Sequence, residues 1–315
     1  MITSLSVNGN GYTQLTTHQR DFYSREVFFQ AQPRLRFRQF AKYKNELMNN
    51  PGKSVIFTKY NNLQMGSSLT ETDIIVPKAI TSNEVTITLK EYGNAVQLTE
   101  FAIQRGIHDL MRDTSKQLAI DCAKVMDTEL RNTALGTTNI VFGGQGTNTP
   151  PANAGSLAAN DGLDTATVKD IVENLATNNA PRFDNEYYVT IAHPHQLRQL
   201  RDDPNWIEAH KYMGRRQLYL GEVGMYEGMV FIETTQMPVL TGTQYNTKYG
   251  VNLALNNVWE AVSFGENAFG LAMALEPEMR DDGVIDMGRK HTLGWYGIWG
   301  QGIIEEDNIF RVVTA

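Results

Sequence analysis

Two strand-like segments separated by a long polar stretch constrain the fold of this chain more than any other feature. Residues 52–60 read GKSVIFTKY, and residues 84–92 read EVTITLKEY. In the second segment, apolar and polar side chains alternate as they do in a half-buried strand. Residues 61–83 lie between them, a gap far longer than the roughly two to five residues of a hairpin turn. The pattern predicts an antiparallel hairpin that projects from the body of the protein as an arm.

The segment after the arm predicts one long amphipathic helix, which the arm enters directly. Apolar side chains recur at helical spacing from Ile107 to Met126, no proline interrupts them, and Gly136 follows as a residue suited to end a helix. Counted over residues 109–134 at about 1.5 Å per residue, this helix would be roughly 39 Å long. We expect a helix of that length to serve as a structural strut.

The rest of the chain alternates between helix and strand patterns. Residues 136–163 are rich in Gly, Asn, Thr, Ala and Pro and mark the internal boundary. Beyond it, residues 164–179 predict a helix capped by Asp164 or Thr165, and residues 187–193 predict a buried strand. A short helix (HQLRQLRDD) and a further strand (GMVFIETTQMP) follow. These elements predict an α/β lobe, after which the tail returns to strands.

Composition places the chain among soluble globular proteins without a membrane span. Of its 315 residues, 41% are hydrophobic and 20% are charged, and no segment approaches the roughly 18 consecutive apolar residues of a spanning helix. The polar N-terminal sequence lacks the basic and apolar regions of a signal peptide. We therefore expect a protein that is made, and assembles, in a cytoplasm.

Charge is distributed unevenly along the chain. The net charge of −7 argues against a dedicated nucleic-acid binder, since such affinity depends on Lys and Arg side chains. Residues 20–44, however, hold seven basic and two acidic side chains, so that this segment carries +5 and the remainder −12. Three interpretations are open: a basic arm that meets acidic neighbours, a solvated helix face, and a direct contact to DNA.

The best candidate for a metal site is a histidine pair around a proline, His193 and His195, with acidic side chains close by in the sequence. Its spacing differs from that of common zinc motifs, and we expect a strand-to-helix turn with capping side chains instead. The glycine-rich residues 142–151 lack both a P-loop and a dinucleotide signature, which predicts a surface loop. The sequence thus predicts no metal ligand and no cofactor-binding residue.

The remaining polar and aromatic groups also predict structure rather than catalysis. Adjacent carboxylates at 281–282 and at 305–306 would point to opposite faces of a strand, so solvated charges are expected instead of a catalytic dyad. The lone Cys122 lies on the apolar face of the predicted helix and is expected in the core. A core position is also expected for the aromatic residues of the tail, Trp295, Tyr296, Trp299 and Phe310. No catalytic residue is predicted.

The succession of a basic N-terminal arm, an extended loop and a long helix resembles the major capsid protein of tailed bacteriophages, which has the HK-97-like fold. More narrowly, GKSVIFTKYNNL with its LTET tip, VTITLKEYGNAVQLTEFA and HTLGWYGIWGQGIIEEDNIFRVVTA are similar to the N-four-type capsid subfamily. The resemblance covers most of the chain, although residues 140–250 match in element order only. It implies an α+β fold with an N-terminal arm, an extended β-hairpin loop, a peripheral domain with a long spine helix, and an axial α/β domain.

The resemblance also implies how the chain is divided. We expect the N-terminal arm at 1–51, the extended loop at 52–94, the peripheral domain with the spine helix at 95–140, the axial domain at 141–255, and peripheral C-terminal strands at 256–315.

The function implied is that of a major capsid protein, not an enzyme, which self-assembles as hexamers and pentamers into the icosahedral shell around a double-stranded DNA genome. It would be located in the virion after assembly in the host cytoplasm. The expected partners are copies of itself, a separate scaffolding protein, a portal protein, a decoration protein, and packaged DNA without sequence-specific binding. No cofactor and no membrane are expected. Two alternatives are a non-viral, encapsulin-like compartment shell of the same fold and a soluble α+β enzyme.

The arm is expected to lie on a neighbouring subunit, because its open edges would promote aggregation if they stayed exposed. Acidic residues at its tip would then pair with basic groups of the segment 20–44 of a neighbour. The residues expected to make inter-subunit contacts are Arg34, Arg36, Arg38, Lys59, Leu63, Met65, Leu69, Glu71, Asp73 and Ile74.

Overall fold

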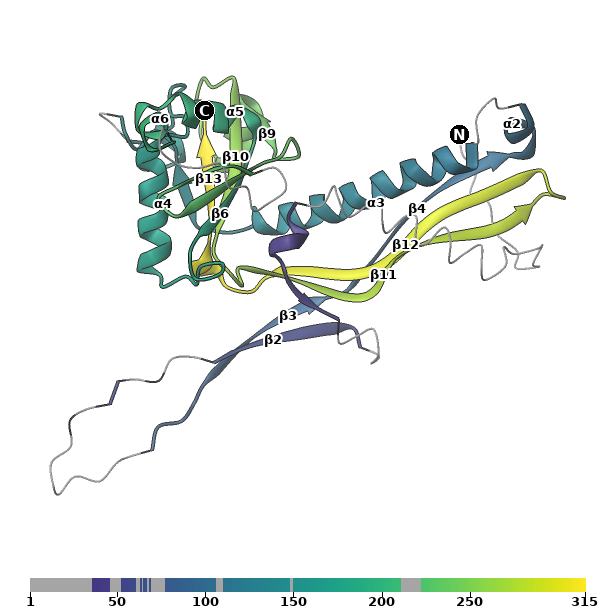
Figure 1. The fold of residues 1–315 in the computed structure, drawn as a ribbon, viewed down its shortest axis with the longest axis horizontal. Coiled ribbons are helices and arrows are strands. Elements are labelled where there is room, and N and C mark those ends of the chain that lie inside the picture. Colours follow the sequence, from purple (N-terminus) through teal and green to yellow (C-terminus); the bar gives the residue numbers. More distant parts are fainter. Residues whose placement is uncertain are drawn as a thin grey trace.

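The computed structural model describes residues 36–45, 52–60, 63, 65–66, 68, 77–105, 110–147, 150–210 and 222–315. Within these ranges, the strands form a four-stranded sheet, a seven-stranded sheet and a two-stranded ribbon. In Figure 1, a lobe of helices and strands lies at one end, a long helix and sheet extend from it, and the ribbon projects away from both.

The four-stranded sheet is antiparallel except at one edge. Its order is β1-β11-β12-β4, and β1 runs parallel to β11. Odd-numbered side chains of β12 from Leu293 to Trp299 are buried and the even-numbered ones between them are more exposed, as expected for a sheet with one covered face. The strands are β1 (Lys42–Lys44), β4 (Lys90–Thr99), β11 (Phe269–Ile285) and β12 (Lys290–Ile303).

A single long helix, α3 (Leu110–Ala134), covers the buried face of this sheet (Figure 1). It buries Leu118, Cys122 and Met126 of the predicted apolar stripe, and also Leu130 one turn further on. Ile107 lies outside the described residues, and the other members of the stripe are half-buried: Leu110, Met111, Thr114 and Val125. Burial raises the pKa of the Cys122 thiol to about 12. The lone cysteine is therefore a core residue, as the sequence predicts.

Aromatic rings fill the space between α3 and the sheet. Trp299 is fully buried and stacks on Tyr92 with ring centroids 4.2 Å apart, and Trp295 donates its indole N–H to the Asp121 carboxylate at 3.0 Å. Tyr296 lies half-buried on the opposite face of the sheet. Phe310 is buried in the lobe. A core position is thus confirmed for all of the tail aromatics except Tyr296.

The expectation that the arm enters the helix directly is wrong. The ribbon strand β3 (Ser82–Thr88) is followed by β4, which pairs with β12 along its whole length, and then by the short helix α2 (Glu100–Arg105). Most side chains of β4 are exposed, and buried and exposed positions do not alternate along it. The strand is held by its ladder with β12 and not by an apolar face of its own. The expected boundary at residue 94 consequently falls inside β4.

The seven-stranded sheet forms the core of the lobe. Its order is β5-β13-β10-β6-β8-β7, with β9 against β10. Every residue of β6 and β13 is buried, as in strands covered on both faces. The strands are β5 (Ile140–Phe142), β6 (Tyr188–Ala192), β7 (Glu222–Tyr226), β8 (Met229–Glu233), β9 (Val239–Thr241), β10 (Asn257–Phe264) and β13 (Ile309–Thr314).

Helices surround this sheet in the lobe (Figure 1). Asp164 caps the first of them by accepting a hydrogen bond from the Thr167 N–H at 2.8 Å. The helices and strands predicted between residues 164 and 238 are confirmed by α4, β6, α5 and β8. The helices are α4 (Thr165–Thr177), α5 (Pro194–Asp202), α6 (Pro204–His210) and α7 (Gly242–Tyr249). The described ranges also contain the single-turn helices η2 (Arg38–Phe40), η4 (Ala154–Ser156) and η5 (Glu306–Asn308).

The chain crosses between the two sheets more often than the sequence predicts. Residues 256–315 are expected beside the spine helix, yet β10 and β13 belong to the seven-stranded sheet, and only β11 and β12 lie in the sheet beside α3. β10 pairs with both β6 and β13, and nearly all of its residues are buried. Its apolar run therefore completes the core of the lobe.

Candidate assembly surfaces

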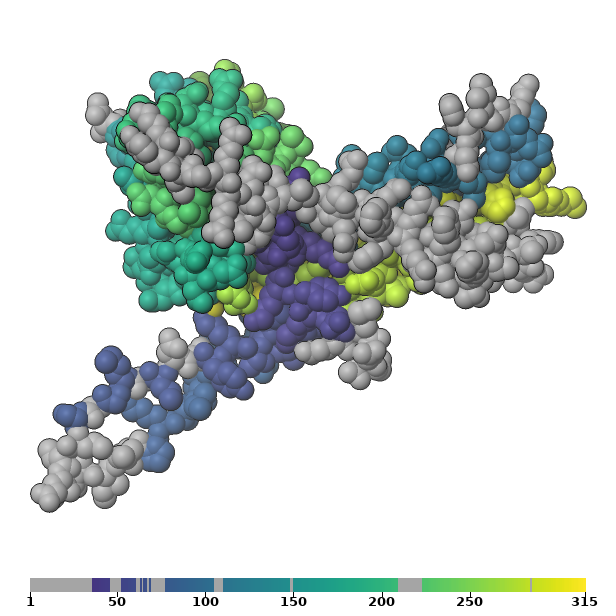
Figure 2. Space-filling model, in the orientation of Figure 1, coloured from purple at the N-terminus to yellow at the C-terminus, as the bar shows by residue number. Residues whose placement is uncertain are grey.

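The arm starts as a ribbon in which β2 (Ser54–Tyr60) and β3 pair in antiparallel register. At the base of the ribbon, Val55, Phe57 and Ile87 form a small apolar core with Ala272 of β11. The two faces of β2 alternate between buried and exposed side chains up to Phe57 and are exposed beyond it. The base of the arm is therefore anchored on its own subunit, and the arm leaves the body at the far end of the strands (Figure 2).

Three glycines give the ribbon a flat surface to lie on, and we call Gly270, Gly300 and Gly302 the glycine floor. A Cβ at position 300 would lie 3.0 Å from Ile87 Cγ2 and closer still to the Thr88 carbonyl oxygen, and a Cβ at position 302 would lie 2.9 Å from Ile87 Cγ1. Side chains at these positions would hold the ribbon away from the sheet. Sequence reasoning missed this contact, although the alternation of glycines in WGQG at 299–302 is a signal of close backbone approach.

Two lysines add polar contacts to the base of the ribbon. Lys44 donates from Nζ to the Ile56 carbonyl oxygen at 3.1 Å and lies 4.7 Å from the centre of the Phe57 ring. Lys59 forms an ion pair with Glu305, which precedes η5. Since both lysines are solvent-accessible, these contacts orient the ribbon more than they stabilise it.

Beyond its base, the arm exposes large apolar side chains. Met65 is 93% exposed and Tyr60 is 70% exposed, and Ile56, Leu63 and Ile80 are also exposed. Leu63 and Met65 belong to the predicted contact residues; the other three were not singled out from the sequence, although Ile56 alternates with the buried Val55 and Phe57. Exposed apolar side chains gathered on one projecting segment are typical of a surface that another chain covers.

The predicted contact residues near the N-terminus are engaged within the chain where they are described. Arg36 donates its backbone N–H to Asp127, and Arg38 lies 3.7 Å from the Glu276 carboxylate and 6.0 Å from the Tyr43 ring centre. A contact of these residues or of Lys59 to a neighbouring subunit stays a prediction. The remaining predicted contacts lie outside the described residues: Arg34, Leu69, Glu71, Asp73 and Ile74.

A buried carboxylate on α3 holds the start of the described chain. Asp127 Oδ1 accepts the backbone N–H groups of Arg36 at 2.9 Å and of Phe37 at 3.0 Å. The Phe37 side chain is fully buried beside it and packs on Phe269, with ring centroids 6.4 Å apart. The contact joins segments that are about ninety residues apart in the sequence, and it fixes where the N-terminal segment leaves the spine helix.

Replacing Asp127 with asparagine is expected to cost more stability at acidic than at neutral pH. Burial raises the pKa of the Asp127 carboxyl above its ordinary value of 3.8, against the opposing effect of the two backbone N–H donors. A carboxyl whose folded-state pKa is raised stabilises the fold fully below its unfolded-state pKa, and this contribution is lost as the pH rises through the folded-state pKa. The difference in unfolding free energy between wild type and D127N should therefore shrink with rising pH.

Urea unfolding at a series of pH values from the ordinary Asp range upward measures this difference. The exposed Asp113 on the same helix provides the matched control D113N, which removes one charge from α3 without removing a buried carboxylate. A D127N difference that grows with pH would contradict the prediction.

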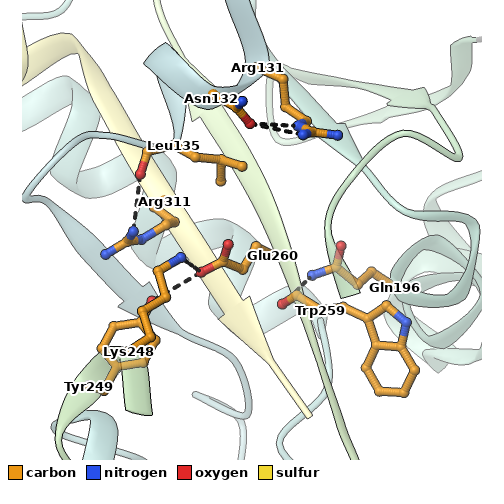
Figure 3. Close-up of polar contacts among 9 residues, drawn as sticks. All are labelled: Arg131, Asn132, Leu135, Gln196, Lys248, Tyr249, Trp259, Glu260 and Arg311. Carbon is orange, nitrogen blue, oxygen red and sulfur yellow. Dashed lines mark hydrogen bonds and ion pairs between the residues drawn. The ribbon is translucent and has the colours of Figure 1, made fainter. Parts of the chain in front are cut away.

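The end of α3 is tied to the lobe by a second buried polar cluster, shown in Figure 3. The Glu260 carboxylate is 1% exposed and accepts hydrogen bonds from Lys248 Nζ at 2.6 Å and from the Tyr249 hydroxyl at 3.1 Å. Burial and this carboxylate raise the pKa of Tyr249 well above its ordinary value. Next to it, Arg311 of β13 donates to the Leu135 carbonyl oxygen at 3.0 Å, directly after α3 ends.

Further contacts brace the same junction. Arg131 on the last turn of α3 donates to Asn132 Oδ1 (Figure 3). It also donates to the Gln236 carbonyl oxygen. Glu306 accepts hydrogen bonds from the hydroxyls of Thr137 at 2.9 Å and Thr138 at 3.0 Å. Charged side chains of α3 and of the lobe thus form hydrogen bonds across their junction, and these bonds hold the spine helix α3 and the lobe at one relative orientation.

The histidine pair forms the expected turn. His193 caps α5, and its Nδ1 accepts the His195 N–H at 3.2 Å while Gln196 bonds back to the His193 N–H. In the described ranges, no group of three or more His, Cys, Asp or Glu side chains could hold a metal ion, and no helix there is long and apolar enough to cross a membrane.

Two expectations about polar segments need correction. Asp281 is buried, not solvated: it lies opposite the buried Leu293 in the ladder with β12, and its Oδ1 accepts the Gly283 N–H at 2.7 Å. The glycine-rich loop is only partly a surface loop: Gly143 and Gly144 are buried, and a Cβ on either would meet Asp161. Both cases depend on contact with another segment, β12 for Asp281 and the loop at Asp161 for the two glycines.

Comparison with known proteins gives one family. Residues 38–249 match the family model described as phage capsid protein. No curated protein is significantly similar in sequence.

Solved structures of phage capsids share the fold at low sequence identity. The capsid of Ralstonia phage GP4 is 15% identical, covers 87% of each chain and has a TM-score of 0.71. The capsid asymmetric unit of cyanophage Pam1 is 16% identical, with a TM-score of 0.69 over 99% of this chain and 98% of that chain. The capsid of cyanophage P-SCSP1u is 17% identical, with a TM-score of 0.64 over 89% and 88%.

Proposed function

Because the chain belongs to the phage capsid protein family, we propose that its copies assemble as hexamers and pentamers into an icosahedral shell that encloses a double-stranded DNA genome. As a major capsid protein with the HK-97-like fold, it has a structural role, and its place is the capsid of the virion. The narrower N-four-type subfamily stays a prediction. The observation that carries the proposal is the projecting arm with its exposed apolar side chains.

The arm suits assembly because it separates an anchored base from a free end. Its base packs on the glycine floor of its own subunit, whereas Tyr60, Leu63 and Met65 are exposed beyond it. Contact with a neighbour would bury these side chains and cover the open ribbon edges. In a closed symmetric assembly the same weak contact recurs at every subunit, so many modest interfaces add up to a stable particle.

The division of the chain follows the same proposal. We assign residues 1–51 to an N-terminal arm, residues 52–94 to the extended loop, residues 95–140 to the peripheral domain, residues 141–255 to the axial domain and residues 256–315 to returning strands. The sheets support two adjustments: β4 joins the peripheral domain throughout, and β10 and β13 join the axial domain.

Other partners follow from the role of a shell. A separate scaffolding protein would guide assembly in the host cytoplasm, a portal protein would occupy one vertex, and a decoration protein would bind the outside. DNA would be enclosed without sequence-specific contacts. The net charge of −7 supports the last point, because an acidic container does not trap DNA electrostatically.

Expression of the chain with and without a candidate scaffolding protein tests the proposal. We expect uniform icosahedral particles by negative-stain microscopy and light scattering. The variant M65E should reduce the particle yield by at least roughly tenfold, because each copy would bury a charge in a repeated contact, whereas M65L should assemble like wild type. A monodisperse monomer or dimer under every condition would refute the function, and normal assembly of M65E would refute the role of the arm.

A further inference from the structure

The two edges of the sheet beside α3 are protected very differently. Past the short partner β1, the edge of β11 contains Pro277, several charged side chains and register shifts, which are features that prevent a further strand from pairing. At the opposite edge, β4 pairs with β12 without a register shift from Lys90 to Thr99. Residues 93–99 of β4 include no charged residue and no proline. In the described chain, nothing pairs with the outer side of β4.

Alternate residues of β4 turn their backbone groups to this open edge. The Glu100 N–H donates to the Arg289 carbonyl oxygen at 2.8 Å, on the β12 side. Because hydrogen-bonded and non-hydrogen-bonded pairs alternate in an antiparallel ladder, the odd-numbered residues Gly93, Ala95 and Gln97 present their N–H and C=O groups outward. Among the described residues, the Ala95 N–H finds only a local acceptor, the Asn94 Oδ1 at 2.9 Å.

A hollow of about 470 Å³ lies beside this edge, on the sheet face away from α3. It is open because Gly93 and Gly294 have no side chains and Ala95 has a short one. One wall is Tyr296, with the Arg280 guanidinium 4.5 Å from its ring centre. A strand added along β4 would place every second side chain on this face, so that one of them would enter the hollow.

We infer that the open edge of β4 takes the uncharged N-terminal segment, residues 1–17, of a second copy of this chain as an added strand. The inference rests on the proposed shell, in which every copy presents both surfaces. The segment contains no Lys, Arg, Asp or Glu and reads MITSLSV at its start, which suits an edge that is itself uncharged. The 35 residues before Arg36 can span more than about 100 Å when extended, enough to reach a neighbouring subunit.

Hydrogen exchange measured by mass spectrometry tests the edge directly. We expect the amides of Gly93, Ala95 and Gln97 to exchange at least roughly tenfold more slowly in assembled particles than in unassembled subunits, since pairing protects them. In particles of the chain lacking residues 1–17, the fast exchange should return. Wild-type particles in which these amides exchange as fast as in the free subunit would overturn the inference while leaving the shell function intact.

A pair of edge variants covers the case in which the truncated chain does not assemble. Q97P removes an outward N–H without touching the β12 ladder, and Q97A keeps that N–H. We expect both subunits to fold with the same circular dichroism, and Q97P alone to lose at least roughly tenfold in particle yield. Equal yields of Q97P and Q97A, or slow exchange that persists in truncated particles, would contradict the inference. Failure of the wild-type chain to form particles would instead count against the proposed function.

Discussion

Replacing Gly300 with alanine is expected to detach the base of the arm and to abolish normal assembly. The new Cβ would lie 3.0 Å from Ile87 Cγ2 and closer still to the carbonyl oxygen of Thr88. The second contact is with backbone, so it cannot be relieved by a change of rotamer. Overpacking of this kind costs about 1–3 kcal/mol. We expect loss of particles by electron microscopy, and faster hydrogen exchange in β2 and β3 of the unassembled subunit.

The arm also provides the matched control. Gly66 lies on the arm, and a Cβ there would meet nothing within 4 Å, so G66A should retain wild-type exchange at the ribbon base. G270A should fall between the two, because its Cβ would meet the side chains of Ile304 and Phe57, which can shift. If G300A assembled and exchanged like G66A, the glycine floor would not hold the arm.

Replacing Lys248 with methionine is expected to lower the unfolding free energy by about 3 kcal/mol, at the lower end of the range for breaking a buried ion pair. The variant would leave the Glu260 carboxylate, 1% exposed, with only the Tyr249 hydroxyl as a described side-chain donor. We choose the lower end because the Lys248 side chain is itself 36% exposed, so that solvent screens part of the interaction. Urea unfolding monitored by tryptophan fluorescence measures the change.

Lys169 supplies the comparison, because its ion pair with Glu227 is long, at 4.0 Å, and exposed on both sides. K169M should change the unfolding free energy by less than about 0.5 kcal/mol. The double variant K248M/E260Q should recover part of the loss, since it removes the unpaired charge. A cost of K248M no larger than that of K169M would show that the cluster does not stabilise the junction between the spine helix and the lobe.

Local periodicity in the sequence is sufficient to predict a helix or strand whose own residues show the apolar pattern of the face that it buries. The apolar stripe that ends at Met126 predicts α3 because the turns of that helix face the same sheet, and β6 is an apolar run that can only be buried. β4 could not be predicted as a continuous strand, because its order depends on pairing with β12, about two hundred residues later. For the same reason, strand patterns did not reveal that β10 and β13 leave the sheet that contains β11 and β12.

The assembly surfaces, too, could be predicted only where a single segment of the sequence carries the signal. The long gap between two strands predicts an arm, and the exposed Leu63 and Met65 agree with that prediction. The open edge of β4 arises only where strands meet, so no single segment predicts it, and the glycine floor has only the local signal of the alternating glycines at 299–302. The basic residues Arg38 and Lys59 show the converse, because their charges suggest a neighbour while Glu276 and Glu305 of the same chain already lie beside them.

The burial of Cys122 has a practical consequence for work on the particle. It is the only cysteine in the chain, and with a pKa of about 12 only about one molecule in ten thousand would carry its thiolate at pH 8. We therefore expect the Cys122 thiol of the unmodified chain not to react with maleimides and other thiol reagents. A cysteine introduced on the arm or along β4 would be the sole reactive thiol of each copy, so fluorophores, cross-linkers or displayed cargo could be attached at one defined position throughout a shell.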